Sequence, residues 1–167
     1  MKKNGRNFLN SFRYAFNGLL FAARSQRNMR VHLSVTVLVS YFGFFYRLTA
    51  VEWVALGGVI TFVIVCEMIN TAIENSVDLA TREYDERAKA AKDVAAGAVL
   101  VASFLAVVVA AFLFLDTARL QSAFDNIFSD VVTMISFTAL ILTELWWIFS
   151  DNTDMTKIDS DNNKQKE

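Results

Sequence analysis

The chain has 167 residues, 54% of them hydrophobic, with a mean hydropathy of +0.36, no proline and one cysteine. Its apolar residues are gathered in long runs that a single soluble domain of this length would not need, so the composition favours a helical membrane protein. The net charge of −1 hides an asymmetry, because residues 1–51 contain eight Lys or Arg and no acid, whereas residues 151–167 contain five acids and three lysines.

Residues 1–30 are predicted to form an amphipathic helix on the membrane surface. Large apolar residues recur there at helical spacing and basic residues fill many of the other positions, as in helices that bind an anionic leaflet. Basic segments also bind nucleic acid, but the large apolar face argues against a nucleic-acid partner. The apolar residues are Phe8, Leu9, Phe12, Phe16, Leu19, Leu20 and Phe21, and the basic ones are Lys2, Lys3, Arg6, Arg13, Arg24, Arg27 and Arg30.

Residues 31–115 are predicted to form a core of three spans, at 31–46, 54–73 and 94–115. The first span ends in a cluster of aromatic residues, which is typical of a membrane interface. Only residues 47–49 connect it to the second span, so the two helices must be antiparallel. The second span continues as a helix to about residue 79, and the charged connection at 80–93 could be largely helical.

Residues 116–150 are expected to add one more transmembrane segment, with a polar connection at 116–130 and a fourth span at 131–149. Glu144 interrupts this span and is interpreted as an interfacial acid near Trp146 and Trp147. Residues 151–167 are polar and are predicted to be a disordered cytoplasmic tail. The expected fold is therefore all-α, an integral membrane bundle with a surface helix, three core spans and a fourth, C-terminal span.

Charge predicts the topology of this multi-pass chain. Two spans separate the basic N-terminus from the connection at 80–93, which carries Arg82, Arg87, Lys89 and Lys92. Both are expected in the cytoplasm, because basic residues are enriched on that side. The connections at 47–52 and 116–130 then lie outside.

Four polar residues form a stripe on the second span. Glu67, Asn70, Glu74 and Asp78 fall within an arc of roughly 80° on one helical face. Ionisable groups at membrane depth are costly, so they indicate a functional site. The connection at 80–93 returns Lys92 and Asp93 to the same boundary. Carboxylates, an amide and a lysine suit phosphoryl transfer with Mg²⁺. The spacing of these residues alone is also compatible with proton-coupled transport.

The stripe and its surroundings resemble the prokaryotic diacylglycerol kinase family, which includes the undecaprenol kinases. The shared pattern is Glu67-x-x-Asn70-x-x-x-Glu74-x-x-x-Asp78, followed by Ala91-Lys92-Asp93. The similarity extends from about Ser11 to Leu115. Its N-terminal motifs, Tyr14-Ala-Phe-Asn-Gly18-Leu and Asn28-Met-Arg30-Val-His32, are closer to the undecaprenol kinase branch.

This resemblance implies a lipid kinase of the bacterial cell membrane that uses ATP and Mg²⁺ and forms homotrimers with shared active sites. Its lipid substrate would be undecaprenol or, as the second choice, diacylglycerol. Glu67 would be the general base on the lipid hydroxyl, and Glu74 would bind Mg²⁺ with Asn70 supporting the site. Lys92 and Asp93 would contact the nucleotide, and Asp78 belongs to the same motif.

One position departs from the family pattern. The family usually has a metal-binding glutamate just before the first span, and Gln26 stands there in this chain. A neutral amide still offers a carbonyl oxygen to Mg²⁺, but one negative charge is lost and the metal site should weaken. The alternative hypothesis is therefore a weakly active or noncatalytic member of the family that binds lipid or nucleotide, or that partners a paralogue.

Overall fold

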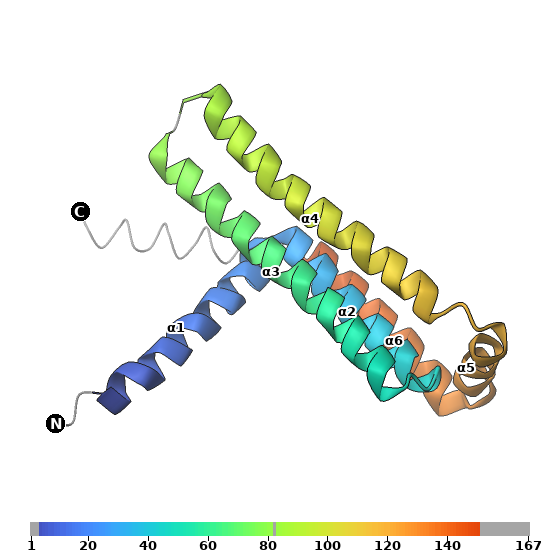
Figure 1. Cartoon of the computed structure of the whole chain (residues 1–167). Helices are drawn as coiled ribbons and strands as arrows, with labels where there is room; N and C mark the ends of the chain where they lie inside the picture. Colours follow the sequence, from blue (N-terminus) through green and yellow to red (C-terminus); the bar gives the residue numbers. More distant parts are fainter. Residues whose placement is uncertain (1–3, 82, 151–167) are drawn as a thin grey trace.

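The computed structural model describes residues 4–81 and 83–150, which form six α-helices (Figure 1). The predicted all-α fold is confirmed. Lys2, Lys3, Arg82 and the expected tail at 151–167 lie outside the described residues, as do the side chains of Arg6 and Leu9. The helices are α1 (Asn4–Ser25), α2 (Arg27–Phe45), α3 (Ala50–Ala80), α4 (Glu86–Leu113), α5 (Thr117–Ser129) and α6 (Val131–Phe149).

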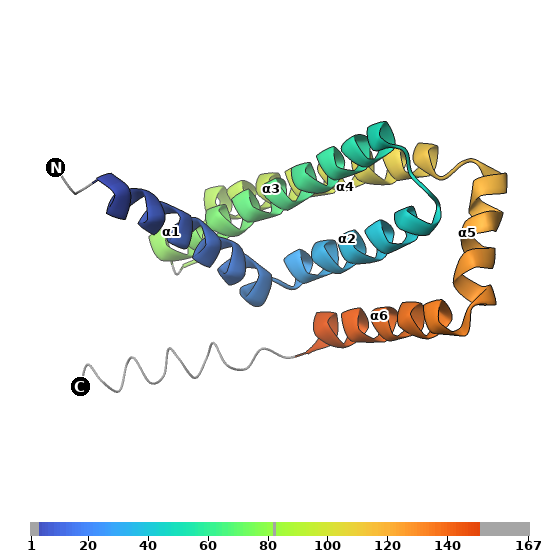
Figure 2. The ribbon, with the colours of Figure 1, turned by 90° about the horizontal axis from the view of Figure 1, so that it is seen from below.

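Helices α3 and α4 form a long antiparallel hairpin, and α2 lies between this hairpin and α6 (Figure 2). Helix α1 leaves the start of α2 at an angle to the bundle. Helix α5 crosses the opposite end and links α4 to α6, so we call this the α5 end. The turn between α3 and α4 defines the other end, which we call the hairpin end.

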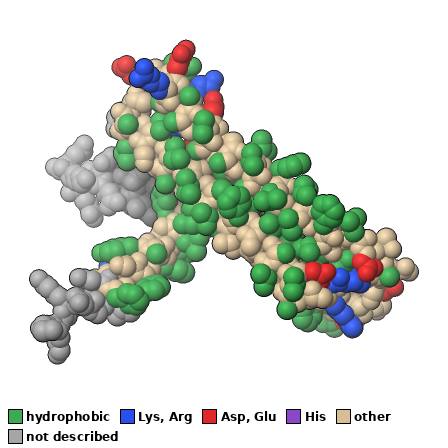
Figure 3. Space-filling model, viewed as in Figure 1, with side chains coloured by type: hydrophobic (Ala, Val, Ile, Leu, Met, Phe, Trp, Pro, Cys, Tyr) green, Lys and Arg blue, Asp and Glu red, His purple; other side chains and the backbone are tan. Residues whose placement is uncertain are grey.

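Three helices in the described part of the chain, α3, α4 and α6, are long and apolar enough to cross a membrane. Helix α2, expected as the first span, has 19 residues but is not among them, because Arg27, Asn28, Arg30 and His32 near its beginning lower its mean hydropathy. Charged side chains gather at the two ends of the bundle, and hydrophobic side chains cover the surface between them (Figure 3). This distribution fits a bundle embedded in a bilayer.

The boundary between the surface helix and the first core helix lies earlier than the sequence indicated. Gln26 has an extended backbone, with φ −107° and ψ 121°, and it separates α1 from α2. Helix α2 therefore begins at Arg27, four residues before the expected span. The sequence offered no sharp signal, since neither Gly nor Pro marks this break.

Helix α4 also begins earlier than the expected third span. The carboxylate of Asp85 caps it by accepting hydrogen bonds from the backbone N–H groups of Arg87 and Ala88, at 2.7 and 3.1 Å. Much of the charged connection is therefore the first two turns of α4. These turns place Lys92 on a rigid helix beside the end of α3.

The tight turn between α2 and α3 anchors the α5 end of the bundle. Arg47 has a φ of 59°, in the left-handed region that side chains other than glycine seldom adopt. A Cβ atom on Gly43 would lie 2.8 Å from Cδ1 of Leu48 and 3.2 Å from Cη2 of Trp53, so glycine permits this close approach without a shift of those side chains. Thr49 and Glu52 then start α3 with a reciprocal capping box.

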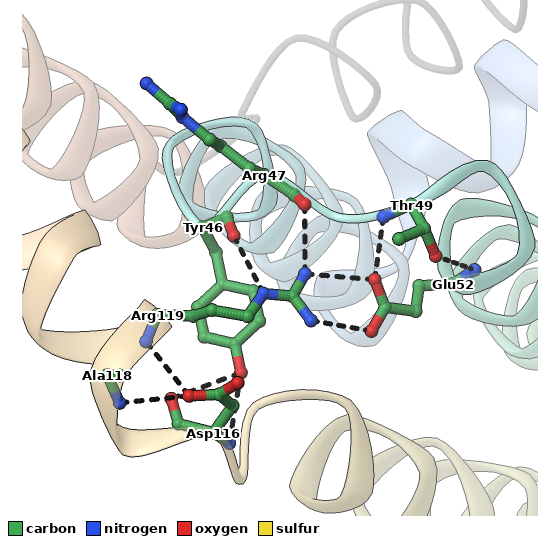
Figure 4. A network of polar contacts seen from close by, with 7 residues as sticks. All are labelled: Tyr46, Arg47, Thr49, Glu52, Asp116, Ala118 and Arg119. Carbon is green, nitrogen blue, oxygen red and sulfur yellow. Dashed lines mark hydrogen bonds and ion pairs between the residues drawn. The ribbon is translucent and has the colours of Figure 1, made fainter.

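The segment expected as a polar connection at 116–130 is largely a helix, α5. The carboxylate of Asp116 caps it, and its buried residues Ala123 and Ile127 face the bundle. Arg119 donates to both carboxylate oxygens of Glu52, at 2.9 and 3.0 Å, and its guanidinium lies 4.3 Å from the centre of the Tyr46 ring (Figure 4). The prediction overlooked the buried stripe because polar residues dominate the segment's composition.

Candidate active site

Glu67 and Asn70 are buried on the second half of α3, with exposed fractions of 1% and 4%. Thr71, on the same helix, is also buried and donates its hydroxyl to the carbonyl of Glu67 at 2.9 Å. Oε2 of Glu67 and Oδ1 of Asn70 are buried and have no hydrogen-bond partner among the residues that the structure describes. A buried acceptor without a donor costs free energy, so these two atoms indicate a place where a ligand supplies the missing contact.

One turn further along α3, the Asn70 amide orients the next carboxylate. Its Nδ2 donates to Oε1 of Glu74 at 3.0 Å, and Glu74 is half-buried. No group of three His, Cys, Asp or Glu among the described residues could hold a metal ion. Mg²⁺, however, is often bound by one or two carboxylates together with water and phosphate oxygens. Glu74 and the free Asn70 oxygen therefore fit Mg²⁺ held jointly with a phosphate, but not Mg²⁺ enclosed by protein ligands alone.

The polar part of the site continues at the hairpin end. Nζ of Lys92 on α4 lies 2.5 Å from Oδ1 of Asp78 on α3, and both side chains line an open cavity of about 330 Å³. Asp93 is exposed on α4, and its side chain makes no hydrogen bond with another described residue. The cavity also includes Tyr84 and Lys89, which were not predicted as site residues. Lys89 could have been predicted, because it precedes Lys92 by three residues and therefore lies on the same side of a helix.

An apolar groove of about 310 Å³ lies on the other side of Glu67 along the bundle. It runs between α2, α3 and α4, and its lining includes Val63 and Ile64, which stand one turn before Glu67. His32 contributes to the α2 wall, so the groove occupies the space between the core helices. The buried carboxylate thus lies between an apolar groove and the polar half of α3.

Gln26 lies apart from this constellation within one copy of the chain. It is half-buried at the break between α1 and α2, and its side chain makes no cap hydrogen bond. In the described part of the chain, no hydrogen bond joins Gln26 to Glu74. The structure thus brings together Glu67, Asn70 and Glu74 on one helix and pairs Asp78 with Lys92, but it does not add Gln26 to either group.

The model of the prokaryotic diacylglycerol kinase family matches residues 13–114. The chain belongs to this family. As a member it is a lipid kinase of the membrane, and all the candidate site residues lie in the matched region. Helices α5 and α6 lie beyond it.

Two curated relatives give the same family. The chain is 38% identical over 117 residues to an undecaprenol kinase of Bacillus subtilis, an alignment that covers 68% of this chain and 95% of the relative. It is 43% identical over 110 residues to a diacylglycerol kinase of Synechocystis sp., covering 65% of this chain and 63% of that relative. No solved structure matches the chain significantly.

Proposed function

We propose that this lipid kinase transfers the γ-phosphoryl group of ATP to the hydroxyl group of undecaprenol, with diacylglycerol as the second choice. The observation that carries the proposal is the buried carboxylate oxygen of Glu67, which has no partner among the described residues and stands one turn after Val63 and Ile64 of the apolar groove. A lipid alcohol needs an apolar channel for its chain and an acceptor for its hydroxyl proton, and this position offers both.

In the proposed reaction, Glu67 is the general base. Its carboxylate accepts the hydroxyl proton as the lipid oxygen attacks the γ-phosphorus atom. The bond to the oxygen that bridges the β- and γ-phosphates breaks, and the products are the lipid phosphate and ADP. The burial of Glu67 excludes water from the base, which favours transfer to the lipid over hydrolysis.

The residues around Glu67 would bind the phosphoryl donor. Glu74, held by Asn70, supplies a metal-binding carboxylate, and bound Mg²⁺ would neutralise phosphate charge. Lys92 would contact phosphate oxygens, with Asp78 fixing the position of its ammonium group. Asp93, exposed next to Lys92, is assigned to the nucleotide.

We infer that the N-terminus and the hairpin end lie on the cytoplasmic side, where ATP is available. The basic residues of the first 51 positions and of the connection between α3 and α4 support this orientation. We also infer a homotrimer with active sites shared between subunits. In support, Leu100, Phe104 and Val107 of α4 are exposed in a single copy, which leaves apolar surface for neighbouring helices.

An assay of the purified full chain tests the proposal. The protein is supplied with Mg²⁺, ATP and either a polyprenol, a diacylglycerol or no lipid, and both ADP and lipid phosphate are measured. We expect ADP release only with lipid, faster with polyprenol, and no turnover by Glu67→Gln. Ile69→Leu is the matched control, because Ile69 lies on the same turn but is exposed. Lipid-dependent turnover by Glu67→Gln at the wild-type rate would contradict the assigned base.

A weakly active enzyme is the second candidate, and the neutral side chain of Gln26 favours it. Such an enzyme would need more Mg²⁺ than a relative with a carboxylate at this position, or would bind lipid and nucleotide with little turnover. A wild-type protein as fast as Gln26→Glu at every Mg²⁺ concentration would contradict this alternative.

A further inference from the structure

Helix α6 is an addition to the family core, and its contacts call for an explanation specific to this chain. The family match ends at residue 114. The 117 aligned residues make up 95% of the Bacillus subtilis relative, which is therefore about 123 residues long and too short for a helix at 131–149. Within this chain α6 lies along α2 (Figure 2).

The end of α6 is bound by basic residues at the start of α2. Nη1 of Arg30 donates to the carbonyl oxygens of Trp147 and Ser150, at 3.1 and 2.7 Å, and Arg30 is buried. The guanidinium of Arg27 lies 5.1 Å from the centre of the Phe149 ring. The last carbonyl groups of a helix lack partners within it and carry partial negative charge, so a buried arginine is a favourable cap.

Glu144, interpreted from the sequence as an interfacial acid near Trp146 and Trp147, makes the second attachment. Ser34 of α2 is 1% exposed and donates its hydroxyl to Oε2 of Glu144 at 2.6 Å. A carboxylate among apolar helices needs such a donor, since lipid offers none. Further along, the hydroxyl group of Tyr41 lies 2.7 Å from that of Ser136. Polar contacts therefore fix α6 to α2 at both ends and between them.

The opposite side of α2 forms one wall of the apolar groove. Val31 and Val35 of α2 line the groove, as do Val63 of α3 and Val107 of α4. Helices α3 and α4 are joined to each other in a continuous hairpin, whereas α2 is the separate wall (Figures 1 and 2). The position of α2 therefore sets the width of the groove.

We propose that α6 holds α2 at the separation from α3 and α4 that the lipid chain requires, with Ser34 and Glu144 as positioning residues. The proposal rests on the assignment of the groove to the lipid in the proposed function. Neither residue lines the groove or touches the reacting atoms, so both act through the placement of α2. Loss of their hydrogen bond should weaken lipid binding and leave nucleotide binding unchanged.

Direct binding measurements on the full chain in detergent test this role. We expect Glu144→Leu and Ser34→Ala to raise the Kd for a short-chain polyprenol about fivefold, as loss of a hydrogen bond to a charged group can do. Glu144→Gln keeps a carbonyl oxygen that can accept the Ser34 proton, so most of the affinity should return. Thr143→Leu is the matched control, because Thr143 is exposed and, among the described residues, its hydroxyl donates only to the carbonyl of Ala139 within α6. It should bind like the wild type.

The same variants are assayed for ATP binding and for lipid-dependent turnover. Wild-type lipid affinity in both Ser34→Ala and Glu144→Leu would overturn the positioning role, even if the kinase is active. An equal loss of lipid and ATP affinity would also overturn it, because that pattern reports general damage. If the variants lose lipid affinity as expected but the wild type never consumes ATP, the positioning role stands and the proposed reaction fails. Should Glu144→Leu not fold, Ser34→Ala decides.

Discussion

The ammonium group of Lys92 on α4 and a carboxylate oxygen of Asp78 on α3 lie 2.5 Å apart, and this ion pair closes the hairpin beside the polar cavity. The two side chains remain 35% and 67% exposed, so the pair contributes little to stability, less than about 1 kcal/mol. The ion pair instead fixes the position of the Lys92 ammonium group. In the proposed function, this position places the ammonium group to contact phosphate oxygens.

Asp78→Asn is the first prediction that follows from this pair. The KM for ATP should rise about fivefold because Lys92 is no longer fixed, while the melting temperature stays close to that of the wild type. Asp125→Asn on the exposed surface of α5 removes the same charge at the far end and should change neither value. An unchanged KM in Asp78→Asn would mean that Lys92 does not depend on Asp78.

Asn70→Ala tests how Glu74, the proposed metal-binding carboxylate, is oriented. The substitution removes the hydrogen bond to Glu74 and the free oxygen next to it. We expect the Mg²⁺ concentration for half-maximal activity to rise about tenfold, an effect typical of losing a partner that orients a metal ligand. Asn75→Ala is the matched control, because Asn75 is exposed and its amide donates to the carbonyl of Thr71 rather than to a carboxylate. If both variants need the same Mg²⁺ as the wild type, Asn70 is not part of the metal site.

The polar stripe that we propose as part of the active site was predictable from sequence because a single helix carries it. Once residues 54–79 are assigned to one continuous helix, the period of 3.6 residues places Glu67, Asn70 and Glu74 on one face, as the structure confirms. The position of Lys92 near the end of this stripe was also predictable, because the short connection at 80–93 returns the chain to the same boundary. These features depend on local geometry, which the order of residues determines.

The contacts of the C-terminal helices were not predictable, because they depend on tertiary packing. Nothing near Glu144 in the sequence indicates that Ser34, 110 positions away, is its partner. The partner of Arg119 is likewise distant, at Glu52. Composition suggested a polar connection for 116–130, whereas the segment forms a helix that buries Ala123 and Ile127 and contacts α2 and α6. Polar residues that pair across helices have the same local pattern as solvated ones.

Gln26→Glu tests the position in the family motif at which this chain departs from the family pattern. Restoring a carboxylate at the break between α1 and α2 should lower the Mg²⁺ concentration for half-maximal activity about threefold or more, because each carboxylate near a hard cation raises its affinity. Asn28→Asp adds the same charge two residues away on an exposed position and serves as the control. A larger effect of Asn28→Asp than of Gln26→Glu would show that general charge, rather than this position, controls the metal.

Arg119→Lys tests the attachment of α5, which is independent of catalysis. Lysine keeps the charge but cannot reproduce the two-pronged contact with Glu52 or the bonds to the carbonyls of Arg47 and Tyr46. The melting temperature should fall by a few degrees, whereas the KM values for ATP and lipid should not change. A fall in kcat without a fall in melting temperature would contradict a purely structural role.

The pH dependence of this attachment has a defined sign. Hydrogen bonds to Glu52 raise the pKa of Arg119 above its ordinary value. The stabilisation is therefore fully present below the pKa that Arg119 has in the unfolded chain. It is lost only as the pH rises through the higher pKa that Arg119 has in the folded protein. Both values lie far above neutrality, so the difference in melting temperature between wild type and Arg119→Lys should be constant from about pH 6 to about pH 9. A difference that disappears by pH 9 would show that another group controls the contact.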